Sequence, residues 1–490
     1  MLLATEPACL DIYTCVNAHW WVAPAYNLLV QRDPQEGIKL FPDLAESWQL
    51  SPDGRTFTIH IRKNVKFQDG TLLTADDVAF NVQRIITPLQ GDIPQLAWAL
   101  GPVTEQVNTV DSQTIQVKLK YPFAPFLELF AIDFFPMYSK SFMLEKRGDL
   151  RAKPPIGTGP FEYQSYTPGV GARLVRNANY WDSGLPYLDG IQLILVKDRA
   201  TQKAALRTHS VDLAGRIFES FSPAEVAEIR QQAPAIVFKP SNSSAGVGLY
   251  LNTRKKPFDD PRVRQAVYLS IDRGAAVKII AEGDGLIGGL FSNYPGWGLT
   301  QEELGKLPGF RDKTSEREQA KKLLVEAGYP QGFSVSVLAR PVPLLQTTAI
   351  FVTGQLQSIN VRGVVDPQTD AAFYPRALKG DFDVAVGAGA NVALDPLMQG
   401  RFFVPGGVLN YTGNSDPKLV QLWSQQMSEN DIGKRRELIR DIETHVLGQY
   451  TFIPIVWPRT YQAHWPNVHD VVIPATDYTG NRLDRIWLSP

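Results

Sequence analysis

Hydrophobic and polar residues alternate along residues 44–62 in a pattern typical of a β-hairpin. The turn sequence SPDG occupies 51–54, where proline presets φ at the second turn position and glycine suits the fourth. The returning strand places Phe57, Ile59 and Ile61 on one face and polar residues on the other. We therefore expect a hairpin with one packed face and one wetted face.

A capped helix is predicted soon after this hairpin. Thr74 is typical of an N-cap, and the two aspartates at 76–77 suit the positive end of a helix dipole. Val78, Val82 and Ile85 then follow at helical spacing. The sequence predicts that this apolar stripe faces the core.

The second half of the chain alternates between strand and helix patterns. Such an order is typical of βαβ units and a largely parallel sheet. The predicted strands are 334–339, 361–365 and 382–387, and the helices between them are 344–357 and 371–378.

Several further elements follow from local patterns. The phenylalanines between 122 and 135 are expected in the core rather than in a ligand site. We also expect a strand at 2–10, a helix at 25–30, strands within 109–119 and at 191–196, a helix at 315–327 with Ser315 in a capping box, a helix at 428–447, and late strands at 452–457 and 468–473.

Composition limits the class of protein. A chain of 490 residues suggests about three domains at ~150 residues each, and the net charge of −1 argues against a nucleic-acid partner. Cys9 and Cys15 either form a small local disulfide or remain buried thiols. No CxxC spacing occurs and the six histidines are scattered, so no metal and no cofactor is predicted.

A resemblance to a known family rests on ordered motifs. They are AESW at 45–48, SPDG at 51–54, R-x-x-V-x-F-x-D-G at 62–70, TADDV at 74–78, GTGPF at 157–161, and the run LYLNTRKKPFDDPRVRQAVYLSIDR at 249–273. In this order they resemble the extracytoplasmic solute-binding proteins of family 5, which serve oligopeptide, dipeptide, opine and nickel ABC transporters.

The resemblance implies an α/β fold of the two-lobed periplasmic-binding-protein-like kind (class II, large cluster C type), with an extra subdomain in the first lobe. The expected divisions are the first lobe in parts at 1–42 and 176–256, the extra subdomain at 43–175, the second lobe at 257–465, and a C-terminal return to the first lobe at 466–490.

The resemblance also implies a function. We expect the substrate-binding component of an ABC importer, which captures a small polar solute between two lobes by hinge closure and delivers it to a transmembrane permease. A periplasmic or otherwise extracytoplasmic, membrane-associated monomer is expected. Since no signal peptide is evident, we expect the targeting segment to have been removed. A purely sensory role stays open.

A ligand site is predicted beyond the strand 382–387, because open α/β sheets bind ligands at the carboxyl ends of their strands. Asp395 precedes Pro396 there, as in the family's loop, where an acid can meet a ligand's amino group. The sequence fits equally well with the alternative that Asp395 only forms a turn before the proline and binds no ligand. The predicted ligand-binding residues are His19, Trp20 and Trp21 from the first lobe, and Trp297, Asn391, Asp395, Arg401, Asn410 and Tyr411 from the second.

The ligand class follows from what the family pattern lacks here. The loop at 388–396 has no tryptophan and the helix 344–357 has no arginine. We therefore expect an opine-like, sugar-containing or modified amino-acid ligand, and an oligopeptide or dipeptide as the runner-up; an oligosaccharide is the sugar candidate. A carbohydrate-active enzyme with paired carboxylates is the rival class, although no GxSxG, HExxH or Walker pattern occurs.

Overall fold

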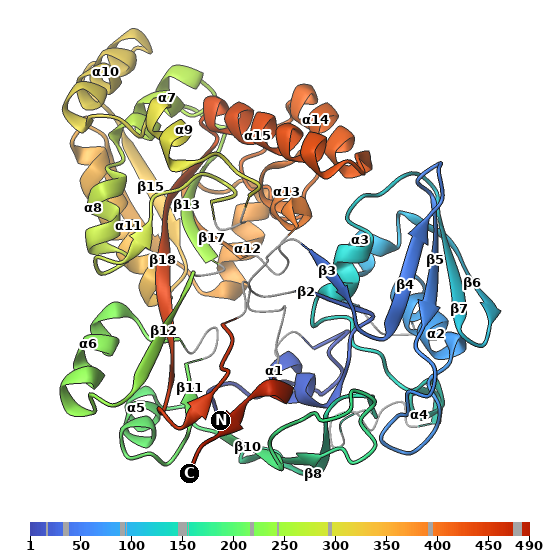
Figure 1. The fold of residues 1–490 in the computed structure, drawn as a ribbon. Helices are drawn as coiled ribbons and strands as arrows, with labels where there is room; N and C mark the ends of the chain where they lie inside the picture. Colours follow the sequence, from blue (N-terminus) through green and yellow to red (C-terminus); the bar gives the residue numbers. More distant parts are fainter. Residues whose placement is uncertain are drawn as a thin grey trace. The chain divides into compact units, whose positions relative to one another are not determined.

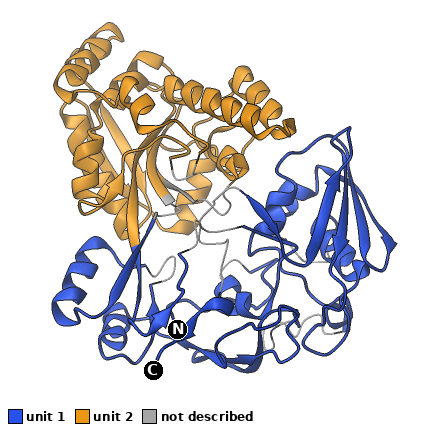
Figure 2. Ribbon diagram, viewed as in Figure 1, with its two compact units in different colours: residues 1–241, 461–490 blue, residues 242–460 orange. Residues whose placement is uncertain are grey.

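The computed structural model describes residues 1–15, 18–32, 39–88, 94, 96–145, 154, 156–215, 220–242, 245–292, 296–390, 395–473 and 483–490. The chain divides into two compact units (Figure 2). The first comprises residues 1–241 and 461–490, and the second comprises residues 242–460. The finer division into five segments remains a prediction from the sequence.

The predicted hairpin and capped helix are confirmed in the first unit (Figure 1). Thr74 and Asp77 form a capping box, and Val78, Val82 and Ile85 are buried. The hairpin belongs to a four-stranded antiparallel sheet of order β4-β5-β7-β6. Its elements are β4 (Ala45–Leu50), β5 (Thr56–Ile61), β6 (Thr104–Asp111) and β7 (Thr114–Leu119), with helix α2 (Ala75–Ile86) against β6 and β7.

A second four-stranded sheet in this unit has the order β1-β10-β9-β8. The strand predicted at 2–10 is only two residues long, and residues 4–10 do not continue it. The aromatic run at 122–135 is buried, as expected for core. Further elements of this unit include β1 (Leu2–Leu3), β8 (Phe161–Thr167), β9 (Gly171–Arg176), β10 (Gly190–Leu195), β2 (Val30–Arg32), β3 (Leu40–Pro42), α5 (Arg199–Arg207), α6 (Pro223–Gln232), β19 (Val468–His469) and β20 (Trp487–Leu488).

The helix predicted at 25–30 is wrong. A short helical turn ends at Ala25, and the chain then extends. The carbonyl groups of Leu28 and Leu29 accept hydrogen bonds from Leu44 and Ala45. Pairing with a distant segment therefore overrides the local apolar pattern.

The second unit is built on a mixed sheet of order β18-β13-β17-β15-β16. The strands β15, β16 and β17 are parallel, as the alternating pattern predicts. However, β13 is antiparallel to both β17 and β18, so only part of the sheet is parallel. The strands are β13 (Ala245–Leu251), β15 (Ser334–Ala339), β16 (Arg362–Pro367), β17 (Val384–Ala390) and β18 (Phe452–His464).

Helices surround this sheet, and two of them differ from the prediction. Helix α10 begins at Lys313 with Asp312 as its N-cap, so Ser315 supplies a backbone N–H to the cap and is not the cap itself. The helix predicted at 428–447 begins at Ile432 and follows a separate helix, α14. The helices include α7 (Pro261–Ser270), α10 (Lys313–Glu326), α11 (Pro343–Gln357), α12 (Asp370–Lys379), α14 (Pro417–Ser428) and α15 (Ile432–Gln449).

Candidate functional site

The aromatic residues predicted near the start of the chain lie on the short helix α1 (His19–Val22). All four of its side chains are buried. The indole N–H of Trp21 donates to the carbonyl of Thr5 (2.9 Å), and its ring meets Tyr166 edge to face at 5.7 Å. Trp20 keeps 7% of its surface exposed, against 1% for Trp21. Trp20 is thus the more accessible of the two tryptophans.

The GTGPF marker supports the turn that follows α1. The N–H of Gly159 donates to the carbonyl of Ala25 at 3.0 Å. A side chain on Gly159 would overlap the backbone of Ala25 and Tyr26. Gln68 donates to Ala25 and accepts from the N–H of Gly157. Close packing therefore explains the glycines of the GTGPF marker, since only glycine allows these backbones to approach so closely.

The turn before α1 is cross-linked. Cys9 and Cys15 form a disulfide with a Cα separation of 5.8 Å, which settles the alternative that the sequence left open. Inside the closed loop, the buried carboxylate of Asp11 pairs with both terminal nitrogens of Arg84. Its Oδ1 also accepts the N–H of Tyr13 at 3.2 Å. A covalent bond and a buried ion pair thus fix the segment that leads to α1.

In the second unit, Asp395 lies directly before a 3-10 turn and is fully buried. Its carboxylate oxygens accept from Arg435 Nη1 at 2.6 Å and Nη2 at 2.8 Å, and Oδ1 also accepts the N–H of Leu397. The Asp-Pro motif therefore forms the turn that the sequence allowed. Its carboxylate is already balanced by a cation of the same unit.

Trp297 contacts the same arginine. The Arg435 guanidinium lies 5.0 Å from the Trp297 ring centre, in a cation–π arrangement. The indole is 1% exposed, and its N–H finds no acceptor among the residues that the structure describes. Arg435 thus brings together two of the predicted residues, Trp297 and Asp395.

Glu443 holds the chain on either side of this tryptophan. Its carboxylate accepts the backbone N–H of Phe291 at 3.1 Å and of Leu299 at 2.6 Å. A side chain on Gly289 would collide with Oε1, and one on Gly298 would lie 2.9 Å from Oε2. Complete burial raises the pKa of Glu443, although the backbone hydrogen bonds and Arg440 oppose that shift.

The other predicted residues of this unit lie in a connected stretch. The N–H of Leu409 donates to the carbonyl of Arg401, so the chain around Asn410 folds back on the short helix α13 (Gly400–Phe403). The Asn410 amide donates to the carbonyls of Val404 and Asn414.

Tyr411 is 4% exposed and packs against the ring of Tyr250, with ring centres 5.1 Å apart. Burial raises its pKa. Arg401 keeps more contact with solvent than Tyr411 and donates Nε–H to Met398. Asn391 lies outside the described residues.

Two charged residues of this site were missed by the sequence reading. Arg435 and Glu443 both lie on the apolar stripe of α15, among Ile439, Ile442 and Val446. A charge on an apolar stripe is the signal that could have found them, since buried charges are normally paired or hydrogen-bonded.

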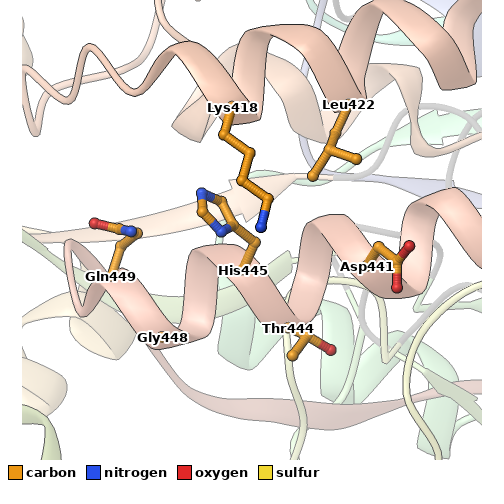
Figure 3. A pocket seen from close by; sticks show the side chains of 7 residues that line it. All are labelled: Lys418, Leu422, Asp441, Thr444, His445, Gly448 and Gln449. Carbon is orange, nitrogen blue, oxygen red and sulfur yellow. The ribbon is translucent and has the colours of Figure 1, made fainter.

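A separate pocket of about 530 Å³ lies between α14 and α15 (Figure 3). Lys418 from one helix and His445 from the other point into the space between them. His445 Nε2 also hydrogen-bonds to the carboxylate of Asp416. None of the residues predicted from the sequence lines this pocket, whose lining is Lys418, Leu422, Asp441, Thr444, His445, Gly448 and Gln449.

Within the described ranges, His, Cys, Asp and Glu side chains form no group of three or more that could hold a metal ion. The helices of the same ranges include none with the length and hydropathy of a membrane span.

Comparison with known proteins shows which structures share this architecture. The structure of HbpA2 from Haemophilus parasuis superposes with a TM-score of 0.85 at 25% identity, covering 100% of this chain and 99% of that one. The structure of AgaA with agropinic acid from A. tumefacien R10 gives a TM-score of 0.77 at 23% identity, covering 100% and 98%. The glutathione-binding protein GsiB of Escherichia coli (strain K12) is 27% identical over 463 residues, 91% of this chain and 86% of that protein.

The fold is that of a mixed α/β periplasmic binding protein, as the sequence predicts. Residues 39–407 match the bacterial extracellular solute-binding proteins, family 5. The chain belongs to this family and is the substrate-binding component of an ABC importer.

Proposed function

We propose that this protein binds a small amino-acid derivative or peptide-like solute and releases it chemically unaltered to an ABC permease. Glutathione, a tripeptide with an isopeptide bond, is the first candidate. The observation that carries the proposal is the similarity to GsiB along 91% of the chain. An extracytoplasmic location and a monomeric state belong to the same proposal.

The lack of an arginine that could anchor the carboxylate of a peptide favours a modified ligand. Helix α11 contains no arginine for a ligand carboxylate. Arg340 is engaged by Asp370 and Arg376 by Asp366 within the same unit. Opines, like glutathione, are modified amino-acid compounds, so they are the second candidate. Unmodified peptides are the alternative, because glutathione is itself peptide-like.

We propose Trp20 and Trp297 as the aromatic contacts for this solute. An indole offers an apolar face and an N–H that usually needs an acceptor when buried. Trp20 keeps 7% of its surface exposed, and the Trp297 N–H has no acceptor among the described residues. His19, Trp21, Asn391, Asp395, Arg401, Asn410 and Tyr411 complete the proposed set.

Isothermal titration calorimetry with four probes tests the ligand class. The probes are reduced glutathione, agropinic acid, the dipeptide Met-Leu and a neutral trisaccharide. We expect saturable binding of glutathione or agropinic acid, at least about tenfold tighter than Met-Leu. Tighter binding of Met-Leu would favour the peptide alternative, and binding of the trisaccharide alone would overturn the proposal.

A further inference from the structure

We propose that helix α15 is the frame of the ligand surface in residues 242–460. By frame we mean that its side chains hold the segments around Trp297 and Asp395, which are proposed ligand contacts, in one position. On this view, Arg435 and Glu443 are positioning residues that hold two chain segments in place. The inference rests on the proposed function, because positioning for a ligand presupposes that a ligand binds. It adds Arg435, which touches Trp297 and Asp395, and Glu443, which bonds the chain on either side of Trp297. Neither residue is proposed to touch the solute.

The two charges share one side of the helix. They are eight residues apart, which places them roughly 80° from one another around the axis. Both are buried, with Arg435 3% exposed and Glu443 fully buried. Opposite charges at two levels of one helix can therefore hold two separate segments at once.

Glu443 holds the segment that contains Trp297. Its two oxygens bind N–H groups on both sides of this tryptophan, at Phe291 and Leu299. The carbonyl of Gly289 accepts the indole N–H of Trp457 at 3.1 Å, which ties the start of the same segment to β18. The glycines at 289 and 298 leave room for the carboxylate.

Arg435 holds the segment that contains Asp395. It donates two bonds to Asp395 and a third, from Nε, to the carbonyl of Gln426 at 3.0 Å. Its guanidinium also lies over Trp297. The two segments therefore share one anchor, and a displacement of α15 would move both.

Buried charged side chains are seldom used to hold chain segments together. Apolar residues of similar volume are often as stabilising as a buried ion pair, so buried charges are weak evidence for stability. Their hydrogen bonds instead fix direction and distance. That property suits a surface whose contacts must be held in one geometry for binding.

Hydrogen exchange of the ligand-free protein tests the anchors directly. The variants are Glu443→Gln and Arg435→Lys, and the control is Glu437→Gln, which makes the same chemical change at an exposed position of α15. We expect faster amide exchange at Phe291 and Leu299 in E443Q, faster exchange in 395–403 in R435K, and no change in E437Q. Unchanged exchange in both segments would overturn the frame, whether or not a ligand binds.

Calorimetry with reduced glutathione tests the positioning role. We expect E443Q and R435K to bind at least about tenfold more weakly than wild type, while E437Q binds normally. Wild-type affinity in both variants, despite faster exchange, would overturn the positioning role. If wild type binds none of the four probes, the proposed function fails, and the exchange result still decides whether α15 anchors the two segments.

The two variants test the two segments separately, so the proposal stays testable if one of them misfolds. Arg435→Lys keeps the charge and loses only the two-bond geometry. Urea unfolding identifies a variant that does not fold, and a variant that does fold decides the outcome for its own segment.

Discussion

Arg435 and Asp395 form a two-bond ion pair inside the second unit, with N–O distances of 2.6 and 2.8 Å. Their side chains are 4% and 1% exposed. Each member of so buried a pair has lost its hydration, and the other member is the partner that balances its charge. Loss of either member therefore leaves a charge with little compensation.

Asp395→Asn should lower the free energy of unfolding by about 3 kcal/mol, since it leaves the guanidinium buried without its anion. Urea unfolding measures this change. Asp381→Asn is the control, because Asp381 pairs with Arg376 but its side chain is 70% exposed, and it should change stability by less than about 0.5 kcal/mol. Equal effects of the two substitutions would show that the buried pair has no special weight.

Glu443 should give the protein a pH dependence of stability with a definite sign. Burial raises its folded pKa above the ordinary 4.5, so the folded state binds this proton more tightly than the unfolded state. Its contribution is fully present below about pH 4.5 and is lost as pH rises through the folded pKa.

Urea unfolding of wild type and Glu443→Gln across pH 4.5 to 8 measures this contribution, because the range starts at the ordinary carboxyl pKa of 4.5 and extends above it. The stability of wild type relative to the variant should fall as pH increases. Parallel pH profiles would contradict the prediction, because they would mean that Glu443 ionises equally well in both states.

Reduction of the disulfide should destabilise the first unit. Cys9 and Cys15 are six residues apart, and closure of so short a loop contributes about 2 kcal/mol in the chain-entropy description. Urea unfolding with and without reductant measures the change. The chain has only these two cysteines, so the double variant Cys9→Ala/Cys15→Ala should match the reduced protein and should not respond to reductant.

Gly159→Ala should destabilise the protein by at least about 2 kcal/mol, because the new methyl group would overlap the backbone of Ala25 and Tyr26. Gly354→Ala is the matched control. Gly354 lies inside α11 with nothing within 4 Å of its added methyl group, so alanine there should stabilise by about 0.5–1 kcal/mol. Thermal unfolding shows both signs; a stable Gly159 variant would disprove the packing role of the GTGPF marker.

Local patterns predicted the regular elements well. The hairpin at 45–61 and the strand at 334–339 appear where alternation placed them, because each pattern reports which face is buried. The 25–30 segment failed because its hydrogen bonds go to Leu44 and Ala45, which no local pattern reveals. The N-cap of α10 was misplaced by three residues, since Asp312 and Ser315 are both good caps.

The candidate site was harder to predict. Trp297 and Asp395 could be named from the sequence, but the arginine that both contact lies 40 residues beyond Asp395. His209 shows the same limit. Its backbone lies in the left-handed region, with a φ of 55°, and its ring stacks on Trp465 with centres 4.1 Å apart. Tertiary contacts decide such positions.

We propose that the protein holds one solute molecule and leaves it chemically unchanged. Isotope-labelled glutathione can be bound at saturation, freed of excess by gel filtration, released by denaturation and analysed by mass spectrometry. We predict one intact molecule per chain. Recovery of a cleaved or modified product would contradict this proposal, and retention of no labelled solute would exclude glutathione as the ligand.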